Sequence, residues 1–161
     1  MPPITALLHT ANNALHLART LEILLPCAEI LIVDHRSTDA TRRVAREYGT
    51  RLVASESDET ENRYVDLARC DWILCMQPGE SITEGLQASL FEWSALSSSG
   101  VAVGVAFSIF VREQTGEHWL ELPAPETRLI PRSWTRWHGR LPAHEPSAVP
   151  LEGELLRFDL P

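Results

Sequence analysis

Four short apolar runs recur along the first half of this sequence, separated by segments long enough for helices. They occupy residues 4–9, 29–34, 51–54 and 72–76, and they are continuously apolar rather than alternating. Such runs are typical of parallel strands that are covered on both faces. Their alternation with helical segments predicts an α/β fold in three layers, with a mainly parallel, Rossmann-like sheet and helices on both faces.

Helical patterns fill the intervals between the runs. The first helix is marked by an apolar stripe at Leu15, Ala18, Leu21 and Leu25. In the second, Ser37 or Thr38 supplies the N-cap and Gly49 ends the helix. The third extends over about residues 61–69.

A fourth helix is expected after the capping-box pair Ser81 and Glu84, with an apolar face at Leu86, Leu90, Trp93 and Leu96. Beyond it, residues 101–111 form an apolar strand pattern, and a hairpin turn and a further strand follow. The tail of residues 141–161 contains four prolines, so we expect little regular structure there. The second half is therefore a short β-rich extension.

With 161 residues, 44% of them hydrophobic, the chain has the size of one domain, composed of an α/β half (residues 1–100) and the extension (residues 101–161). No apolar stretch reaches the roughly 18 residues of a membrane span, and no secretory leader pattern begins the chain, so we expect a cytoplasmic protein. The formal charge of −8 argues against nucleic acid as a partner.

The basic side chains are all arginine, 14 in number, and no lysine is present. This excludes the lysine-containing phosphate loop, but arginines can still bind a small anion in a forked geometry. The three cysteines form no Cys-x-x-Cys pair and are expected to be free thiols in a reducing compartment.

Ligands of open α/β sheets bind beyond the carboxyl ends of the strands. Asp34, at the end of the second run, is the best single candidate, because its carboxylate can accept hydrogen bonds from a nucleobase or a ribose. The following Ser37, Thr38 and Asp39 are better explained as helix-capping residues. For Asp34 itself, a ligand role and a structural role remain equally open.

Two further polar segments need an interpretation. The acidic loop at residues 55–62 has no recognised calcium-loop spacing, so a solvated loop is favoured over a metal site. In the extension, Arg132, Arg136 and Arg140 recur every four residues among Trp134 and Trp137. Such residues suit sugars and phosphates, but a strand with tryptophans on the core and arginines in water explains them equally well.

Together these segments resemble the inverting family-2 glycosyltransferases of the GT-A fold. EILIVDHRSTDATRRVAREYG resembles the family's Val-Asp-x-x-Ser-Thr-Asp-Gly-Thr element and is the most specific match. ITALLHTANN resembles the opening strand and turn, NRYVDLARCDWILCMQPGESIT the segment that leads into the metal motif, and ETRLIPRSWTRWHGRLPAHE the acceptor-side strands with a closing His-Glu pair.

The resemblance implies that Thr10, Asn12 and Asp34 surround the nucleotide of a nucleotide-sugar donor. It places His144 and Glu145 on the acceptor side, where Glu145 is the candidate base for the acceptor hydroxyl. Candidates for phosphate or acceptor contacts are Glu80, Arg132, Arg136, Arg140 and His144.

The sequence departs from the family at the metal motif. Where the family has Asp-Ala-Asp, this chain has Gln77-Pro78-Gly79, and only Glu80 agrees. No metal-binding residues and no cofactor are therefore expected, and Mg²⁺ or Mn²⁺ would bind only through the donor diphosphate. Arginines are the candidate replacement for the cation.

Two functions follow from the resemblance. The first is an inverting glycosyltransferase that acts on a glycan or lipid-linked acceptor. The second is a catalytically degenerate binding or scaffolding module of the same fold. A homodimer is a further hypothesis, because the region that builds the acceptor site is short and the apolar run at residues 101–111 resembles an edge strand.

Overall fold

The computed structural model describes residues 3–24, 27–56, 60–98 and 106–158. Its α/β half consists of β1 (Ile4–Thr10), α1 (Ala14–Leu24), β2 (Glu29–Asp34), α2 (Thr41–Glu47), β3 (Arg51–Ala54), α3 (Glu61–Asp66) and β4 (Trp72–Met76). The second half consists of β5 (Glu80–Ile82), α4 (Glu84–Ser98), β6 (Phe107–Thr115), β7 (His118–Trp119), β8 (Ala124–Pro131), β9 (Trp137–His138), β10 (Leu141–Pro142) and β11 (Val149–Arg157).

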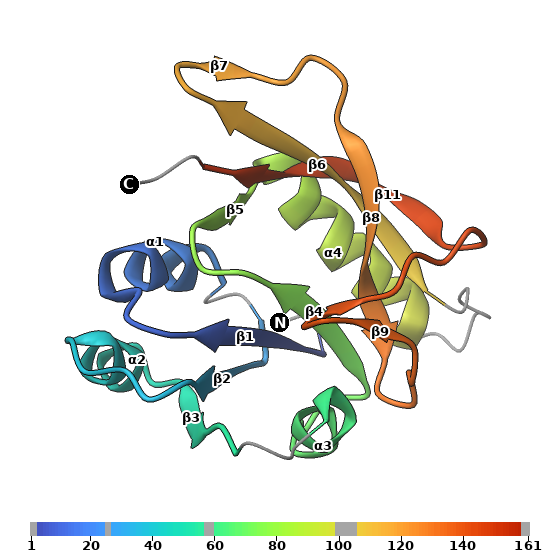
Figure 1. Ribbon diagram of the computed structural model, residues 1–161. Coiled ribbons are helices and arrows are strands. Elements are labelled where there is room, and N and C mark those ends of the chain that lie inside the picture. Colours follow the sequence, from blue (N-terminus) through green and yellow to red (C-terminus); the bar gives the residue numbers. More distant parts are fainter. Residues whose placement is uncertain (1–2, 25–26, 57–59, 99–105, 159–161) are drawn as a thin grey trace.

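One curled sheet runs through both halves of the chain (Figure 1). Its strand order is β3-β2-β1-β4-β8-β6-β11-β5, and β7 pairs with the end of β6. The first four strands are parallel, as expected for continuously apolar runs. From β4 onward the pairing is mostly antiparallel, with β6 and β11 parallel to each other.

Helices cover both faces of the sheet, as predicted. On one face, α1, α2 and α4 pack on side chains from β1, β2, β4, β6, β8 and β11. On the other face, α3 and the segment around Trp134 pack on the alternate side chains of β1, β2, β4 and β8. The described cysteines lie free in or beside this core, and burial raises the pKa of Cys27 and of Cys75 to about 12, so both remain thiols.

The helices exist where the pattern predicted them, but several local details differ, and α3 ends at Asp66 rather than near residue 69. In α1 the buried face is formed by Leu17, Leu21 and Leu24, whereas Leu15 is 64% exposed. Before α4, Ser81 belongs to β5, and the hydroxyl of Thr83 accepts the hydrogen bond from the Leu86 amide. The cap of α4 therefore lies two residues later than predicted. Leu25 lies outside the described residues.

The second helix also begins later than expected. It starts at Thr41 after Ala40, which makes no side-chain capping hydrogen bond. Ser37 and Thr38 lie in the loop before it, where they bond to the neighbouring turn instead. Gly49 ends the helix with a φ of 69°, as predicted from its place after the apolar stripe.

The expectation of an irregular tail was wrong, because β11 is an inner strand of the sheet. It pairs with β6 on one side and β5 on the other, and the register shifts between Pro150 and Glu154. Pro150 therefore lies at the start of the strand and before the irregularity, where a missing amide is tolerated. The remaining prolines do not interrupt the paired segment from Glu154 to Arg157.

The described part of the apolar run at residues 101–111 does not form the predicted edge. Residues 101–105 lie outside the described residues, and residues 107–111 belong to β6, which has β8 and β11 on its two sides. The hairpin of β6 and β7 instead extends beyond the sheet (Figure 1). Within the described ranges, no helix has both the length and the apolar character needed to cross a membrane.

Candidate functional site

Two neighbouring cavities lie at the carboxyl ends of the parallel strands. The first cavity, of about 450 Å³, is lined by His9, His35, Glu56, Glu61, Tyr64 and Arg140 among others. The second cavity, of about 400 Å³, is lined by His9, Asn13, Gln77, Pro78, Arg140 and Leu141 among others. Both are bordered by His9 and Arg140, so together they form one crevice across the ends of β1, β2 and β4.

A third cavity, of about 430 Å³, adjoins this crevice on the side of the extension. It is lined by Pro125, Thr127, His138, Leu141, Pro142 and His144 among others. Leu141 borders both the second and the third cavity. The three cavities therefore follow one another, and their character changes from polar at the first to largely apolar at the third.

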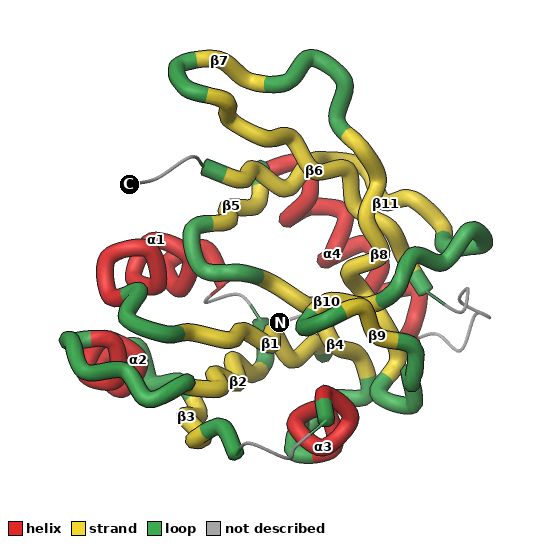
Figure 2. The backbone as a smooth tube through the Cα atoms, viewed as in Figure 1, coloured by secondary structure: helices red, strands yellow, loops and turns green. Residues whose placement is uncertain are grey.

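Arg140 reaches the crevice because the extension folds back over the sheet. It follows Gly139, whose φ of 63° forms the turn between β9 and β10, and β10 contacts β8 and β4 (Figure 2). The Asn62 side chain of α3 holds this segment, accepting a hydrogen bond of 3.0 Å from the Trp137 indole and donating to the carbonyl of Trp134. Tertiary contacts, rather than local sequence, thus set the position of Arg140.

The three regularly spaced arginines have different surroundings. Arg132 donates to the carbonyl of Ala68 and pairs with Asp71, which directly precedes β4, so it lies at the opposite end of that strand from the crevice. Arg136 pairs with Glu145 and lies over the Trp134 ring, 4.5 Å from its centroid. Arg140 alone of the three borders the crevice, and no described residue forms a hydrogen bond or ion pair with it.

The predicted nucleotide-binding residues Thr10 and Asn12 join two turns to each other. The Thr10 hydroxyl donates to the side-chain oxygen of Asn13, and the side-chain Oδ1 of Asn12 accepts from the backbone amide of Thr38 at 2.8 Å. Asn12 adopts a φ of 52°, which turns its side chain toward the loop before α2. Neither residue borders the crevice, whereas their neighbours His9 and Asn13 do.

Asp34 is 3% exposed, and its carboxylate is already occupied. Its oxygens accept hydrogen bonds from the hydroxyl and amide of Ser37 and from Nε of Arg42. Burial raises the pKa of this carboxyl, but the bonds from Ser37 and Arg42 outweigh that effect, so the net pKa is lowered. Of the two roles left open for Asp34, this geometry favours the structural one.

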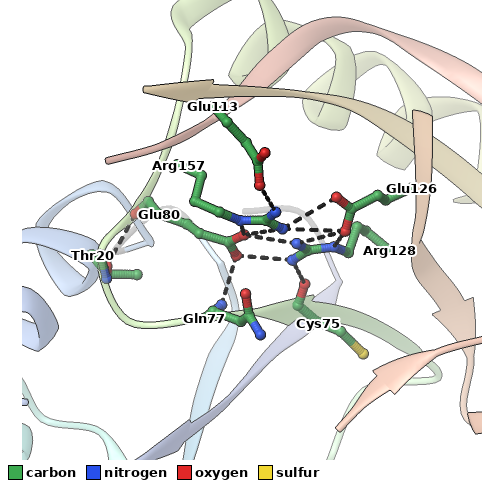
Figure 3. A network of polar contacts seen from close by, with 9 residues as sticks. Thr20, Cys75, Gln77, Glu80, Glu113, Glu126, Arg128 and Arg157 are labelled. Carbon is green, nitrogen blue, oxygen red and sulfur yellow. Dashed lines mark hydrogen bonds and ion pairs between the residues drawn. The ribbon is translucent and has the colours of Figure 1, made fainter. Parts of the chain in front are cut away.

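Glu80 is enclosed in a network of ion pairs behind the crevice (Figure 3). Its carboxylate receives two hydrogen bonds from Arg128, of 2.8 and 2.7 Å, and two longer ones from Arg157. The backbone amide of Gln77 donates to this carboxylate at 2.7 Å, and the hydroxyl of Thr20 in α1 donates to the backbone carbonyl of Glu80. Glu80 therefore fixes the turn after β4 and does not face a ligand.

The turn after β4 does not fit a divalent cation. Mg²⁺ and Mn²⁺ require several oxygen ligands, usually with one or two carboxylates. Here the residues that face the second cavity are Gln77 and Pro78, and the nearest carboxylate, Glu80, is bound by two arginines. Among the described residues, no group of three His, Cys, Asp or Glu side chains is arranged to hold a metal.

Glu145, the predicted base, lies beside the third cavity rather than in it. Its carboxylate accepts from the hydroxyl of Ser147 at 2.6 Å and forms an ion pair with Arg136. These contacts lower its pKa to about 2, so its affinity for a proton is small at neutral pH. His144, next to it in sequence, borders the third cavity.

A chain of three titratable residues borders the first cavity. The sequence analysis assigned no role to its two histidines and placed Glu61 in a solvated loop, whereas Glu61 begins α3 and its side chain is only 11% exposed. Nε2 of His9 lies 2.9 Å from a carboxylate oxygen of Glu61, and Nδ1 of His9 lies 2.7 Å from Nε2 of His35. His9 is 8% exposed, and the Tyr64 ring packs edge-on against it. The signal available in the sequence was positional, because His9 and His35 come directly at two adjacent strand ends.

The sequence matches no protein-family model, and no curated protein is significantly similar to it. The fold does have solved counterparts. The crystal structure of S. aureus TarS 1–349 is 15% identical, with a TM-score of 0.50 over 71% of this chain and 36% of that one. The same protein in complex with UDP is 16% identical, with a TM-score of 0.50 over 71% and 37%.

A structure of glucosyl-3-phosphoglycerate synthase from Mycobacterium tuberculosis, with Mn²⁺, UDP-glucose and phosphoglyceric acid, is 14% identical, with a TM-score of 0.48 over 70% of this chain and 44% of that one. These neighbours are GT-A glycosyltransferases, so the likeness to TarS confirms the GT-A-like α/β fold predicted from the sequence. The chain spans only 36% of the TarS 1–349 structure, and identity this low establishes the fold alone.

Proposed function

We propose that this protein binds a nucleotide-sugar donor across the first and second cavities and transfers the sugar to a hydroxyl in the third. The observation that carries this proposal is the position of Arg140, which borders both donor cavities at the carboxyl ends of the strands. A ligand that spans both cavities passes beside its guanidinium. The UDP complex of TarS supports a nucleotide as the ligand of this fold.

Arg140 takes the part of the cation in this proposal. A guanidinium offers a planar fork of donors that binds two phosphate oxygens at once and stays charged at any physiological pH. The surrounding crevice is bordered by polar side chains on the nucleoside side and by Pro78 and Leu141 on the sugar side. The charge that develops on the leaving phosphate is then stabilised by an arginine, without a carboxylate-bound metal.

The reaction follows from the order of the cavities. The acceptor oxygen forms a bond to the anomeric carbon while the bond from that carbon to the donor phosphate oxygen breaks, and the electron pair leaves with the nucleotide. Attack from the face opposite the leaving group inverts the configuration. The proton of the acceptor hydroxyl passes to a base, for which His138 and His144 border the third cavity, whereas Glu145 is held by Arg136. Glycans and lipid-linked sugars are the acceptor classes that this chemistry suits.

A binding module without transferase activity is the second candidate. One specific observation favours it: the carboxylates of Glu80, in the turn after β4, and of Glu145 both form ion pairs within the protein. In that case the crevice would still hold a nucleotide, but the leaving group and the acceptor would not be activated.

One experiment separates the two candidates. Nucleotide-sugars with different bases are tested for thermal stabilisation of the full chain, with and without Mn²⁺, and then for hydrolysis or transfer. Stabilisation that needs no metal, together with turnover, supports the transferase. Stabilisation without turnover identifies the module, and no stabilisation by any nucleotide contradicts both.

A further inference from the structure

The hydrogen-bonded chain of Glu61, His9 and His35 fixes which nitrogen atoms carry protons. An ionised carboxylate only accepts hydrogen bonds, so the Nε2 atom of His9 that faces Glu61 must carry hydrogen. Neutral His9 then has a lone pair at Nδ1, which can only accept from Nε2 of His35. Neutral His35 in turn has its lone pair at Nδ1.

The Nδ1 atom of His35 is the end of the hydrogen-bonded chain that a ligand in the first cavity could contact. The ring of His35 is partly exposed and borders the first cavity. Its Nδ1 atom forms no hydrogen bond with any residue in the described part of the chain. Burial, followed by the charges of Arg140 and His9, lowers the pKa of His35, which favours the neutral ring with its lone pair.

One additional proton reverses this arrangement. If the proton enters at His9, both its nitrogens donate, so His35 accepts at Nε2 and carries hydrogen at Nδ1. If it enters at His35 directly, Nδ1 again carries the hydrogen. In either case the atom available to a ligand changes from an acceptor to a donor.

We propose that the Glu61–His9–His35 chain is a proton-linked specificity determinant of the donor cavity. In its unprotonated form it accepts a hydrogen bond from a ring N–H flanked by a carbonyl, as present in uracil, thymine and guanine. Cytosine and adenine have an unprotonated ring nitrogen in the corresponding position. Its lone pair would face the lone pair of His35, so no hydrogen bond could form. This inference rests on the proposed nucleotide-binding function of the crevice.

The remaining groups around His35 suit the same ligand edge. Arg36 borders the first cavity and can donate to a carbonyl beside a ring N–H. The negative charges of Asp34 and Glu61 act on His35 in the opposite direction to Arg140 and His9. Glu56 and Tyr64 complete the titratable groups of the cavity.

The test is binding of UDP, dTDP, GDP, CDP and ADP to the full chain by titration calorimetry, at about pH 8 and about pH 5.5. At the higher pH the nucleotides with a ring N–H should bind about tenfold more tightly than CDP and ADP, the range expected for an unpaired polar group. At the lower pH this ratio should fall, because the protonated form of His35 donates at Nδ1 instead of accepting. Because all five carry the same diphosphate, titration of the phosphate cancels in the ratio.

Variants assign the effect to the chain. His35→Phe should remove both the discrimination and its pH dependence, whereas His35→Gln, whose amide oxygen accepts, should keep the discrimination and lose the pH dependence. Glu61→Gln should weaken the discrimination, because it removes the carboxylate that fixes the His9 proton. His118→Phe, at the exposed β7 hairpin, is the matched control and should leave binding unchanged.

The possible failures are distinguishable. If no nucleotide binds at either pH, the proposed function is wrong and this inference falls with it. If nucleotides bind but the base preference is absent, or is the same in His35→Phe as in the unmodified protein, the inference alone is overturned. Melting curves of each variant show that the fold is retained.

Discussion

The carboxylate of Glu80 and the guanidinium of Arg128 form a two-pronged ion pair in which both side chains are enclosed, at 1% and 0% exposure. Arg128 also donates to the carbonyl of Cys75 and to Glu126. Although burial disfavours its charge, the pairing with Glu80 and Glu126 raises the pKa of Arg128. This pair connects the turn after β4 to β8.

Breaking this pair should be strongly destabilising. Arg128→Met leaves Glu80 with Arg157 as its remaining cation, and the loss of one partner of a buried ion pair costs about 3–5 kcal/mol of unfolding free energy. Urea denaturation measures the effect. Adding Glu80→Gln to Arg128→Met should recover a large part of the loss, because the unpaired charge is then absent. Arg43→Met, which alters an exposed pair with Glu47, is the matched control, and an equal loss there would refute the prediction.

Arg140→Gln should weaken nucleotide-sugar binding without loss of stability. Arg140 is exposed, and a charge-assisted hydrogen bond to phosphate is worth about tenfold or more in affinity. Calorimetric titration with a nucleotide diphosphate, with and without Mn²⁺, measures the change. Arg43→Gln on α2 serves as the control for overall charge. Unchanged affinity in Arg140→Gln would remove Arg140 from the phosphate site.

Asp34→Ala should reduce the stability of the fold. Its loss leaves the hydroxyl and amide of Ser37 without their acceptor, which costs about 1–3 kcal/mol for buried groups. Urea denaturation measures the change. A variant that melts like the original chain but no longer binds nucleotide would instead establish a ligand role for Asp34.

The contribution of Asp34 also depends on pH. Its folded pKa lies below the ordinary value of 3.8, so its stabilising effect is fully present above that value and is lost as the pH falls through the folded pKa. Asp34→Asn does not titrate at this position. The stability difference between the two proteins should therefore shrink only below about pH 4. A difference that already disappears at neutral pH would contradict the lowered pKa.

Gly153→Ala should be one of the most damaging small substitutions in the chain. Gly153 has a φ of 95°, and a Cβ there would lie 2.1 Å from the backbone nitrogen of Leu86 at the start of α4. The backbone of α4 cannot move aside as the tip of a flexible side chain can. We therefore expect a loss of about 3 kcal/mol in unfolding free energy. Gly116→Ala is the control, because a Cβ there meets no atom within 4 Å and adds only the strain of its φ of 61°, about 1 kcal/mol. Equal effects would show that conformation, not contact, dominates at Gly153.

The parallel strands could be predicted because their signal is local. A continuously apolar run such as residues 29–34 indicates a strand whose two faces are both covered by other elements, and β2 has those same bounds. The strand β11 could not be predicted, because its prolines suggest irregular structure and only pairing with β6 and β5 makes it a strand. In the same way, the buried side of α1 depends on how the helix is rotated against the sheet.

The crevice lies at the carboxyl ends of the strands, where the sequence analysis placed a ligand, but none of the three predicted nucleotide-binding side chains borders it. Thr10 and Asp34 bond to neighbouring turns, while His9 and His35, each one position away, border the cavity. Successive side chains of a strand point to opposite faces, so an error of one residue exchanges an inner contact for a place at the crevice.

The amino-acid sequence by itself determined the alternating α/β framework and the sheet edge at which the crevice lies, since apolar runs and turn residues act over a few neighbouring positions. Only the tertiary structure decided which charges meet there. Glu80 is closed off by Arg128 and Arg157 from distant strands, and Arg140 is brought over the crevice through the bonds of Asn62 to the extension. Such pairings join residues far apart in the chain, so no local pattern encodes them.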